Sequence, residues 1–247
     1  MTQLYQQSYY EQMKNMIIAS TSTIFGSGYL EYLMPEIQNH FADCEEILFI
    51  PYARPTGITH EVYTKKVAIE FEKIGLKIKS IDAYDDPVEA LQKAKGIFTG
   101  GGNTFLLVTK LYQNRMMDVL AQVIKSGTKY LGTSAGCGIC GLTMQNTNDM
   151  PIIMPPSFKT LGLFPFNINP HYLDPDPNTK HMGETREIRI KEFHNLNPQP
   201  VVGLREGSWL DIKGNKIVLQ GTLQARVFEK NKEPFEIESG TDLSLLK

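Results

Sequence analysis

Short apolar runs alternate with segments of helical period along the first half of this chain, and this alternation constrains its fold most. Residues 46–51 (EILFIP) are almost continuously apolar, as expected of a strand covered on both faces. Residues 29–41 carry apolar side chains every four positions, as one face of a helix does. Such a sequence predicts a parallel β-sheet covered by helices. The expected strands are residues 16–20, 46–51, 76–81 (an edge strand), 96–99 and 129–132, and the expected helices are residues 29–41, 62–74, 88–94 and 104 to about 124.

The second half of the chain has a different pattern. Frequent prolines between residues 151 and 177 predict loops and short strands over the ends of the sheet. A helix is expected at 183–193, and strands are expected at 201–204, 208–212, 216–219 and 225–228. No internal repeat or long linker divides the chain, so we expect one α/β domain over residues 16–247. Residues 1–15 are polar and aromatic and are expected to form an N-terminal extension.

Charge and cysteine content exclude several classes of protein. The 25 Lys and Arg against 27 Asp and Glu leave no positive surplus for nucleic acid or an anionic membrane. No apolar run is long enough for a membrane-spanning helix, and the first residues lack the apolar core of a signal peptide. Three cysteines fit a reducing cytoplasm. Cys137 and Cys140 form a C-x-x-C, but no second pair completes a zinc site, so neither a metal nor another cofactor is expected.

A G-x-S-x-G motif, Gly132-Thr133-Ser134-Ala135-Gly136, lies between a predicted strand and a helix. A sharp turn at this place would hold the Ser134 hydroxyl out over the edge of the sheet as a nucleophile. The N–H groups that begin the next helix could stabilise an oxyanion there. The alternative is a tight turn in which Ser134 only caps the helix.

Three glycines, Gly100 to Gly102, end another predicted strand and precede Asn103. Their backbone could approach a substrate closely and supply a second oxyanion donor. The segment has neither the G-K-[ST] ending of a phosphate loop nor the G-x-G-x-x-G spacing, which disfavours nucleotide binding. Because ligands collect at the carboxyl ends of parallel strands, we expect the strands before Gly100 and Ser134 to end side by side over one cleft.

A serine nucleophile needs a base, and the sequence offers five histidines. His171, in the proline-rich region, leads His181 modestly because loops often carry catalytic groups. The other three, His40, His60 and His194, lie near helix ends, where structural or solvated histidines are usual.

An acid that would orient this histidine has two candidates, Asp149 and Glu206. Each is a polar residue beside an apolar segment, and either could be a turn residue. Spacing does not choose between them.

The chain contains five motifs in this order: Gly100-Gly101-Gly102-Asn103, Gly132-x-Ser134-Ala135-Gly136, Asn148-Asp149-Met150-Pro151, Asn169-Pro170-His171 and Gly183-Glu184-Thr185-Arg186-Glu187. The set resembles peptidase E, the α-aspartyl dipeptidase branch of a serine peptidase family that also contains cyanophycinase. The resemblance spans roughly residues 96–207 and implies a three-layer α/β fold. That fold is a flavodoxin-like or class I glutamine amidotransferase-like doubly wound parallel sheet with a nucleophile elbow.

The resemblance implies that Ser134 is the nucleophile and His171 the general base. It implies Asp149 as the third member of the triad, with Glu206 as the rival. The oxyanion donors would be the N–H groups of Gly102 and Ala135.

The substrate implied by the resemblance is a small peptide that begins with aspartate. A bidentate guanidinium is the natural reader of the aspartyl carboxylate, and Arg186 is the candidate, with Arg205 as the alternative. Asp149 or Glu184 could accept hydrogen bonds from the free amino group, and Asn103 is expected to contact the substrate.

One departure from the family motif lies after the nucleophile, where Cys137-Gly138 stands in place of Ala-Asn. Two other functions stay open. The first is a cyanophycinase-like β-aspartyl peptidase, and the second is a non-catalytic binding member of the amidotransferase-like fold. Both a monomer and a homodimer are compatible with the sequence.

Overall fold

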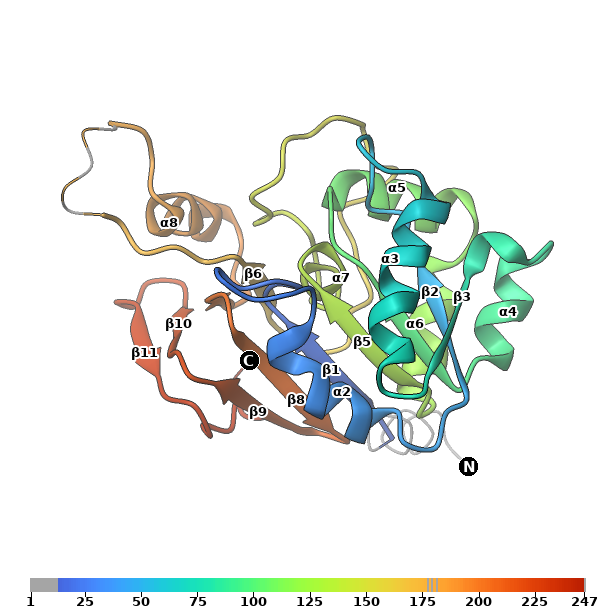
Figure 1. Ribbon diagram of the computed structural model, residues 1–247. Coiled ribbons are helices and arrows are strands. Elements are labelled where there is room, and N and C mark those ends of the chain that lie inside the picture. The colour runs from blue at the N-terminus through green and yellow to red at the C-terminus, as the bar shows by residue number, and fades with distance from the viewer. Residues whose placement is uncertain (1–12, 177, 179, 181, 247) are drawn as a thin grey trace, which may run out of the picture.

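The computed structural model describes residues 13–176, 178, 180 and 182–246 (Figure 1). The strands are β1 (Asn15–Ala19), β2 (Glu46–Ile50), β3 (Lys77–Ser80), β4 (Gly96–Thr99), β5 (Lys129–Thr133), β6 (Asn167–Pro170), β7 (Val201–Leu204), β8 (Ser208–Lys213), β9 (Lys216–Gly221), β10 (Ala225–Phe228) and β11 (Phe235–Ile237). The helices are η1 (Glu31–Leu33), α2 (Met34–His40), α3 (His60–Glu72), η2 (Ile81–Ala83), α4 (Pro87–Lys93), α5 (Thr104–Gln113), α6 (Met117–Lys125), α7 (Ala135–Gly138) and α8 (Arg186–Leu196).

The main sheet has the strand order β3-β2-β4-β5-β1-β8-β9. Strands β1 to β5 pair in parallel, and β3 lies at the edge, as the alternation of apolar runs and helices predicts. The α/β fold with a large, mostly parallel sheet is therefore confirmed. Strands β8 and β9 extend the sheet beyond β1 in antiparallel pairing, which the short hairpin connection between them permits.

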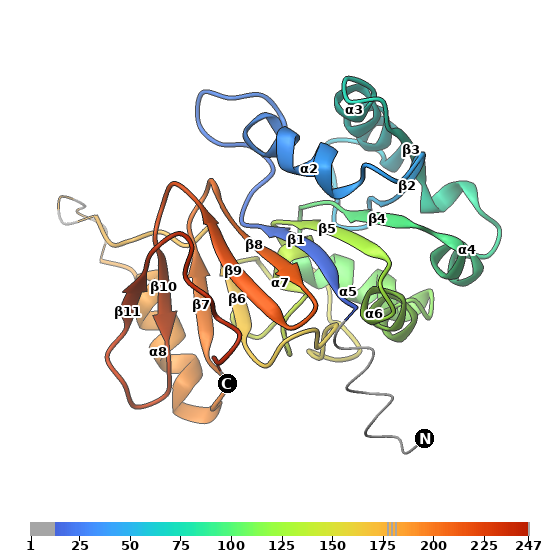
Figure 2. The same cartoon turned by 90° about the horizontal axis from the view of Figure 1, so that it is seen from below.

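Helices cover both faces of this sheet (Figure 2). On one face, Phe41, Val67 and Phe71 of the α2–α3 side pack against strand residues such as Phe49 and Phe98. On the other face, the helices α4, α5 and α6 pack against the same strands. Because each strand of the parallel part is covered twice, its sequence is apolar almost throughout.

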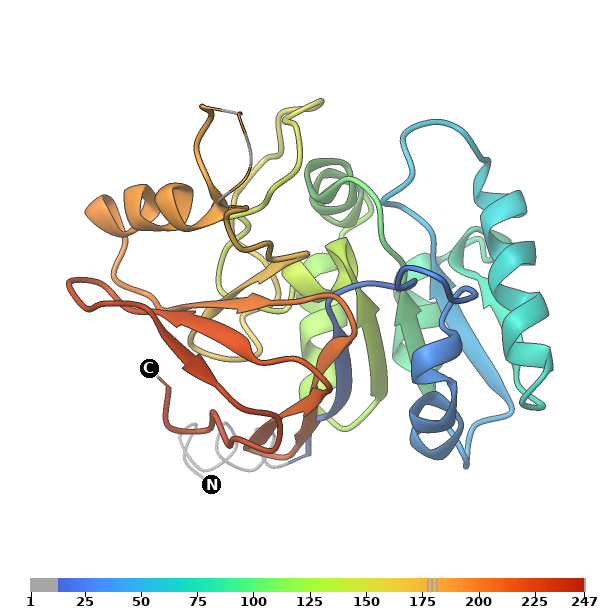
Figure 3. The ribbon, with the colours of Figure 1, turned by 60° about the vertical axis from the view of Figure 1, so that its left-hand side comes forward.

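A second sheet, with the order β11-β10-β7-β6, lies beside the first. Helix α8 packs on it through Ile190, which belongs to a small buried cluster with Tyr172, Val201 and Phe228. Strands β6 and β7 are parallel neighbours, and Pro170 pairs with Leu204. This sheet supplies the segments that follow β6 and β7, which reach the edge where β5 ends (Figure 3).

Most expected elements are present with boundaries shifted by one to three residues, for example α8, which begins at Arg186 and not at 183, and two larger differences concern a helix and the N-terminal extension. The helix expected from 104 to about 124 is divided into α5 and α6 because Arg115 adopts a left-handed backbone with φ 56°. Of the expected extension, residues 1–12 lie outside the described residues, and Asn15 already belongs to β1. Lys14 is buried and its Nζ donates to the carbonyl of Leu163 (2.9 Å), so the ordered domain begins before residue 16.

Candidate active site

Ser134 lies between β5 and α7 in a turn with φ 54° and ψ −113°. A positive φ is unfavourable for a residue with a side chain, so this turn is strained, as predicted for a nucleophile elbow. A Cβ on Gly132 would lie closer than 3.0 Å to the carbonyl of Gly136, and a Cβ on Gly136 would lie as close to the carbonyl of Thr99. The two glycines of the motif therefore let the strand and the helix approach each other.

The triple glycine follows β4, which pairs directly with β5. The triple glycine and the nucleophile turn, which follow these two strands, therefore lie side by side, as expected. Gly101 lies against the nucleophile, since a Cβ there would be 3.1 Å from Ser134 Oγ. Gly102 has φ 147°, and its neighbour Asn103 donates its N–H to the carbonyl of Ala53 (2.7 Å).

The two expected oxyanion donors, the N–H groups of Gly102 and Ala135, donate to no acceptor in the part of the chain that the structure describes. Ala135 is the first residue of α7, so its N–H has no partner within the helix. Both polar atoms of the Asn103 side chain form hydrogen bonds. Its Oδ1 accepts from the Leu106 N–H (3.0 Å) and its Nδ2 donates to the Met150 carbonyl (2.8 Å).

His171 follows β6, and its Nε2 lies 2.8 Å from Ser134 Oγ. The histidine has φ 54°, and its backbone N–H donates to Ser20 Oγ (2.8 Å). The Ser20 hydroxyl in turn donates to the carbonyl of Leu204 (2.7 Å). Ser20 thus ties the ends of β1, β6 and β7 together. It belongs to no motif, and its position directly after the first strand is the only sequence signal for this role.

The other ring nitrogen of His171, Nδ1, lies 2.6 Å from Oε1 of Glu206. Asp149, which the resemblance favours as the orienting acid, forms its hydrogen bonds with other residues. Its Oδ2 accepts from the backbone N–H of Thr104 (2.6 Å) at the start of α5. The geometry therefore does not fit Asp149 as the partner of His171 and does fit the rival, Glu206. The cause is the parallel pairing of β6 and β7, which brings their carboxyl ends together.

A cavity of about 200 Å³ opens beside Ser134. Arg186, the first residue of α8, lines it and forms no ion pair with any described residue. Burial and the positive charge of Arg189 lower the pKa of Arg186, and the negative charge of Asp149 acts in the opposite direction. A guanidinium stays protonated in proteins, so the cavity holds a cation beside a carboxylate. Its lining residues are Thr104, Ser134, Ala135, Thr147, Asn148, Asp149, Pro170, His171 and Arg186.

Three other candidates for substrate contact, Asn103, Glu184 and Arg205, do not line this cavity. Glu184 pairs with Arg189 (3.5 Å). Arg205 pairs with Asp174 and Glu236, each at 2.8 Å, and these hydrogen bonds raise its pKa. Arg205 is thus already neutralised by carboxylates of its own chain.

Among the residues that the structure describes, the other histidines and the cysteines do not line the cavity beside Ser134. His40 is buried, His60 Nδ1 lies 2.8 Å from Asp82 Oδ2, and His194 Nε2 lies 3.0 Å from the Gln199 carbonyl. His181 lies outside the described residues. Cys137 and Cys140 are buried free thiols, and burial raises the pKa of each. Within the described ranges, no group of three or more His, Cys, Asp or Glu could hold a metal ion.

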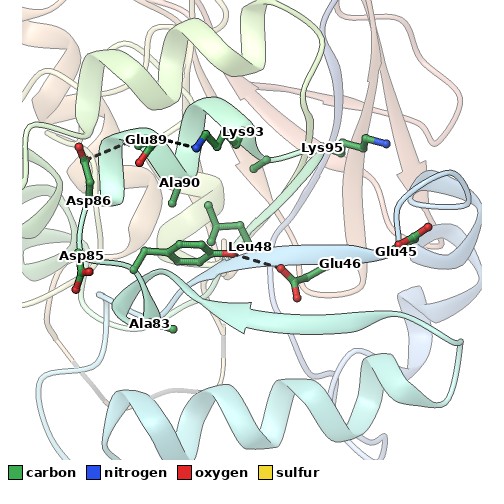
Figure 4. Close-up of a pocket in the computed structure, with 12 residues that line it drawn as sticks. Glu45, Glu46, Leu48, Ala83, Asp85, Asp86, Glu89, Ala90, Lys93 and Lys95 are labelled. Atoms are coloured by element: carbon green, nitrogen blue, oxygen red, sulfur yellow. Dashed lines mark hydrogen bonds and ion pairs between the residues drawn. The ribbon is translucent and has the colours of Figure 1, made fainter.

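A larger groove of about 590 Å³ lies where β2 and β4 begin (Figure 4). Glu46 and Glu89 line it, and both already have partners, since Glu46 accepts from the Tyr84 hydroxyl (3.3 Å) and Glu89 pairs with Lys93. Ser134 follows the carboxyl end of β5, whereas this groove lies along α4, reaches the amino ends of β2 and β4, and shares no lining residue with the cavity beside Ser134. It therefore takes no part in the chemistry at Ser134.

A serine that contacts a histidine, which in turn contacts a carboxylate, is the arrangement of a serine hydrolase, and the protein belongs to this class. The sequence matches the family described as peptidase family S51 over residues 16–220. The chain therefore belongs to peptidase family S51 and is a serine-type peptidase. No helix that the structure describes is long and apolar enough to cross a membrane.

Named relatives agree with this family. The chain is 42% identical over 232 residues to a peptidase E of Streptomyces coelicolor, covering 94% of each chain. It is 38% identical to the “Probable alpha-aspartyl dipeptidase” of Drosophila melanogaster, covering 94% of this chain and 97% of that protein. Among solved structures, a peptidase from an acI-B1 actinobacterium has a TM-score of 0.64 at 17% identity, covering 96% of this chain and 98% of the other, which supports the fold.

Proposed function

We propose that this enzyme hydrolyses dipeptides whose first residue is aspartate. The observation that carries the proposal is the cavity beside Ser134, which is lined both by Arg186, a residue without an ion-pair partner among the described residues, and by the carboxylate of Asp149. A guanidinium binds a carboxylate through two parallel hydrogen bonds, so Arg186 would bind the aspartyl side chain. Asp149 has one carboxylate oxygen that accepts no hydrogen bond within the described residues, and it would accept from the free amino group.

The hydrogen bonds around His171 support a mechanism in two halves. His171 Nε2 takes the proton of Ser134 while the serine oxygen attacks the carbonyl carbon of the aspartyl residue. Glu206 holds the ring and stabilises its positive charge. The N–H groups of Gly102 and Ala135 would bind the oxyanion. His171 then gives its proton to the leaving amine, and an acyl-enzyme on Ser134 remains. A water molecule loses a proton to His171 as its oxygen attacks the acyl carbon. The ester bond to Ser134 breaks, aspartate leaves, and His171 returns the proton to the Ser134 oxygen.

The dimensions of the cavity favour this substrate over the β-linked alternative. A cyanophycinase-like enzyme must accept an aspartate that carries an arginine on its side chain, and a cavity of about 200 Å³ is small for such a branch. A non-catalytic role is opposed by the short contacts from Ser134 to His171 and from His171 to Glu206. We also place the activity in the cytoplasm, in keeping with three free cysteines.

The test is hydrolysis of Asp-Leu, β-Asp-Leu, Glu-Leu, Ala-Leu and N-acetyl-Asp-Leu by the wild type and by Ser134→Ala, with a chelator present. We expect cleavage of Asp-Leu alone, and its loss in Ser134→Ala. Preference for β-Asp-Leu would instead assign the cyanophycinase-like activity. If no peptide is cleaved and a fluorophosphonate fails to label Ser134, the protein is a binding member of the fold.

A further inference from the structure

A second arginine near the nucleophile has no carboxylate partner. Of the six arginines, all of which the structure describes, Arg189, Arg205 and Arg226 form ion pairs with carboxylates. The other three, Arg54, Arg115 and Arg186, form none with any described residue. Arg115 is exposed beyond the far end of α5, whereas Arg54 follows β2 at the same edge of the sheet as Ser134.

Arg54 is held beside the glycine loop by Tyr63. Its guanidinium carbon lies 4.7 Å from the centre of the buried Tyr63 ring. The hydroxyl of the same tyrosine accepts a hydrogen bond from the Gly101 N–H (3.1 Å). Gly101 lies against Ser134, as its contact with the nucleophile shows. A single side chain therefore separates the Arg54 guanidinium from the backbone at the nucleophile.

One donor of the Arg54 guanidinium is unsatisfied. The Nε of Arg54 is buried without a hydrogen-bond partner among the described residues, while the residue as a whole keeps part of its surface exposed. Burial raises the pKa of the nearby Tyr29 hydroxyl, and the positive charge of Arg54 acts against that rise. A guanidinium that is partly desolvated and has no anion of its own is a favourable site for a carboxylate.

Arg54 lies outside the pocket proposed for the aspartyl residue, since it does not line the cavity that contains Arg186. The leaving amine receives its proton from His171, so the second residue of the dipeptide lies on the side of that ring. His171 is anchored to Ser20, and the segment that follows Ser20 leads to Tyr29, whose hydroxyl lies 3.4 Å from that of Tyr63. Tyr63, which carries the Arg54 guanidinium, is therefore linked both to Gly101 beside Ser134 and to the segment that anchors His171.

We propose that Arg54 binds the C-terminal carboxylate of the dipeptide. The proposal rests on the function proposed above, because an Asp-X dipeptide carries two carboxylates, one on its first side chain and one at its end. Arg186 would bind the first and Arg54 the second. Such a contact would make the enzyme select substrates by their free C-terminus, and it would favour dipeptides over longer chains.

The test compares Asp-Leu with Asp-Leu-amide, which lacks the terminal negative charge, in the wild type, Arg54→Met and Arg54→Lys. Methionine keeps the packing on Tyr63, and lysine keeps the charge without the bidentate fork. We expect the wild type to prefer Asp-Leu over its amide in kcat/KM by about 10- to 100-fold, the range of a charge-assisted hydrogen bond. In Arg54→Met, kcat/KM should fall on Asp-Leu and stay unchanged on Asp-Leu-amide, so that the preference is lost. Arg54→Lys should keep part of the preference. Arg115→Met is the matched control and should leave both values unchanged.

Three results would overturn the proposal. A wild type that cleaves both peptides equally well refutes it without any variant, and leaves the aspartyl dipeptidase function intact. An equal loss on both peptides in Arg54→Met would show that the residue only supports Tyr63 and the glycine loop. A wild type that cleaves neither peptide refutes the proposed function, and the role of Arg54 falls with it.

Discussion

The Nδ1 atom of His171 lies 2.6 Å from Oε1 of Glu206, while Nε2 of the same ring lies 2.8 Å from Ser134 Oγ. A carboxylate at Nδ1 favours the tautomer in which Nε2 can accept the serine proton, and it stabilises the imidazolium that forms. The two residues are 35 positions apart and meet because β6 and β7 run in parallel to the same edge.

This pairing predicts different effects for the two candidate acids. Glu206→Gln should lower kcat on Asp-Leu by about 100-fold with little change in KM, because the general base loses its orienting charge. Asp149→Asn should mainly raise KM, because it removes the negative charge that would bind the substrate amine and turns one of the two carboxylate oxygens into an NH2 donor. Steady-state kinetics of both variants separate these effects. An inactive Asp149→Asn beside a nearly fully active Glu206→Gln would return the orienting role to Asp149.

The unpaired guanidinium in the cavity predicts a change of specificity. Arg186→Met should lower kcat/KM on Asp-Leu by about 10- to 100-fold, the cost of a hydrogen-bonded charge pair, and should leave any activity on Ala-Leu unchanged. Arg189→Met, one turn along the same helix, is the control and should keep the preference for aspartate. If Arg186→Met still prefers Asp-Leu over Ala-Leu, Arg186 does not bind the aspartyl side chain of the substrate.

The crowding at the nucleophile turn predicts a large loss of stability in Gly136→Ala. The added Cβ would lie closer than 3.0 Å to the carbonyl of Thr99, a backbone atom that cannot move without displacing β4. Overpacking of this kind costs about 1–3 kcal/mol or more in the free energy of unfolding. Gly138→Ala is the matched control, because its Cβ would meet Pro170 at 3.7 Å, an ordinary contact. Urea unfolding measures both, and equal stability of the two variants would contradict the prediction.

Burial of His40 predicts a loss of stability in acid. Burial, with the positive charges of Lys213 and Lys129, lowers the pKa of His40 to about 3. Between about pH 3 and pH 6.5, His40 is protonated in the unfolded chain and neutral in the folded protein. The stability that the neutral, buried His40 contributes is therefore present above about pH 6.5 and is lost as the pH falls. From pH 7 to 4.5 the loss should be about 3 kcal/mol.

The matched variants are His40→Leu, which removes the buried ring, and His60→Gln, which removes a more exposed histidine. Urea unfolding at the two pH values should show that the stability of the wild type falls by about 3 kcal/mol more than that of His40→Leu. His60→Gln should follow the wild type. An identical acid response in the wild type and His40→Leu would mean that His40 does not titrate on unfolding.

Local patterns predicted much of the fold. Buried parallel strands need apolar residues on both faces, so β2, β4 and β5 stand out as short apolar runs with boundaries close to those observed. The nucleophile turn could also be predicted, because a serine flanked by two glycines between a strand and a helix meets a local steric demand. The break between α5 and α6 was missed, since it depends on a left-handed backbone at Arg115 that has no glycine to signal it.

The sequence by itself determined which residues can do chemistry and that β4 and β5 would bring the glycine loop to Ser134. Only the tertiary structure decided their partners. Asp149 and Glu206 are both acids beside apolar segments, and the parallel pairing of β6 with β7 placed Glu206 at His171. Arg186 and Arg205 are both arginines in polar segments, and packing around β7, β10 and β11 gave Arg205 two carboxylates while Arg186 kept none. The physical reason is that a charge is satisfied by neighbours in space, and those neighbours come from strands that lie far apart in the chain.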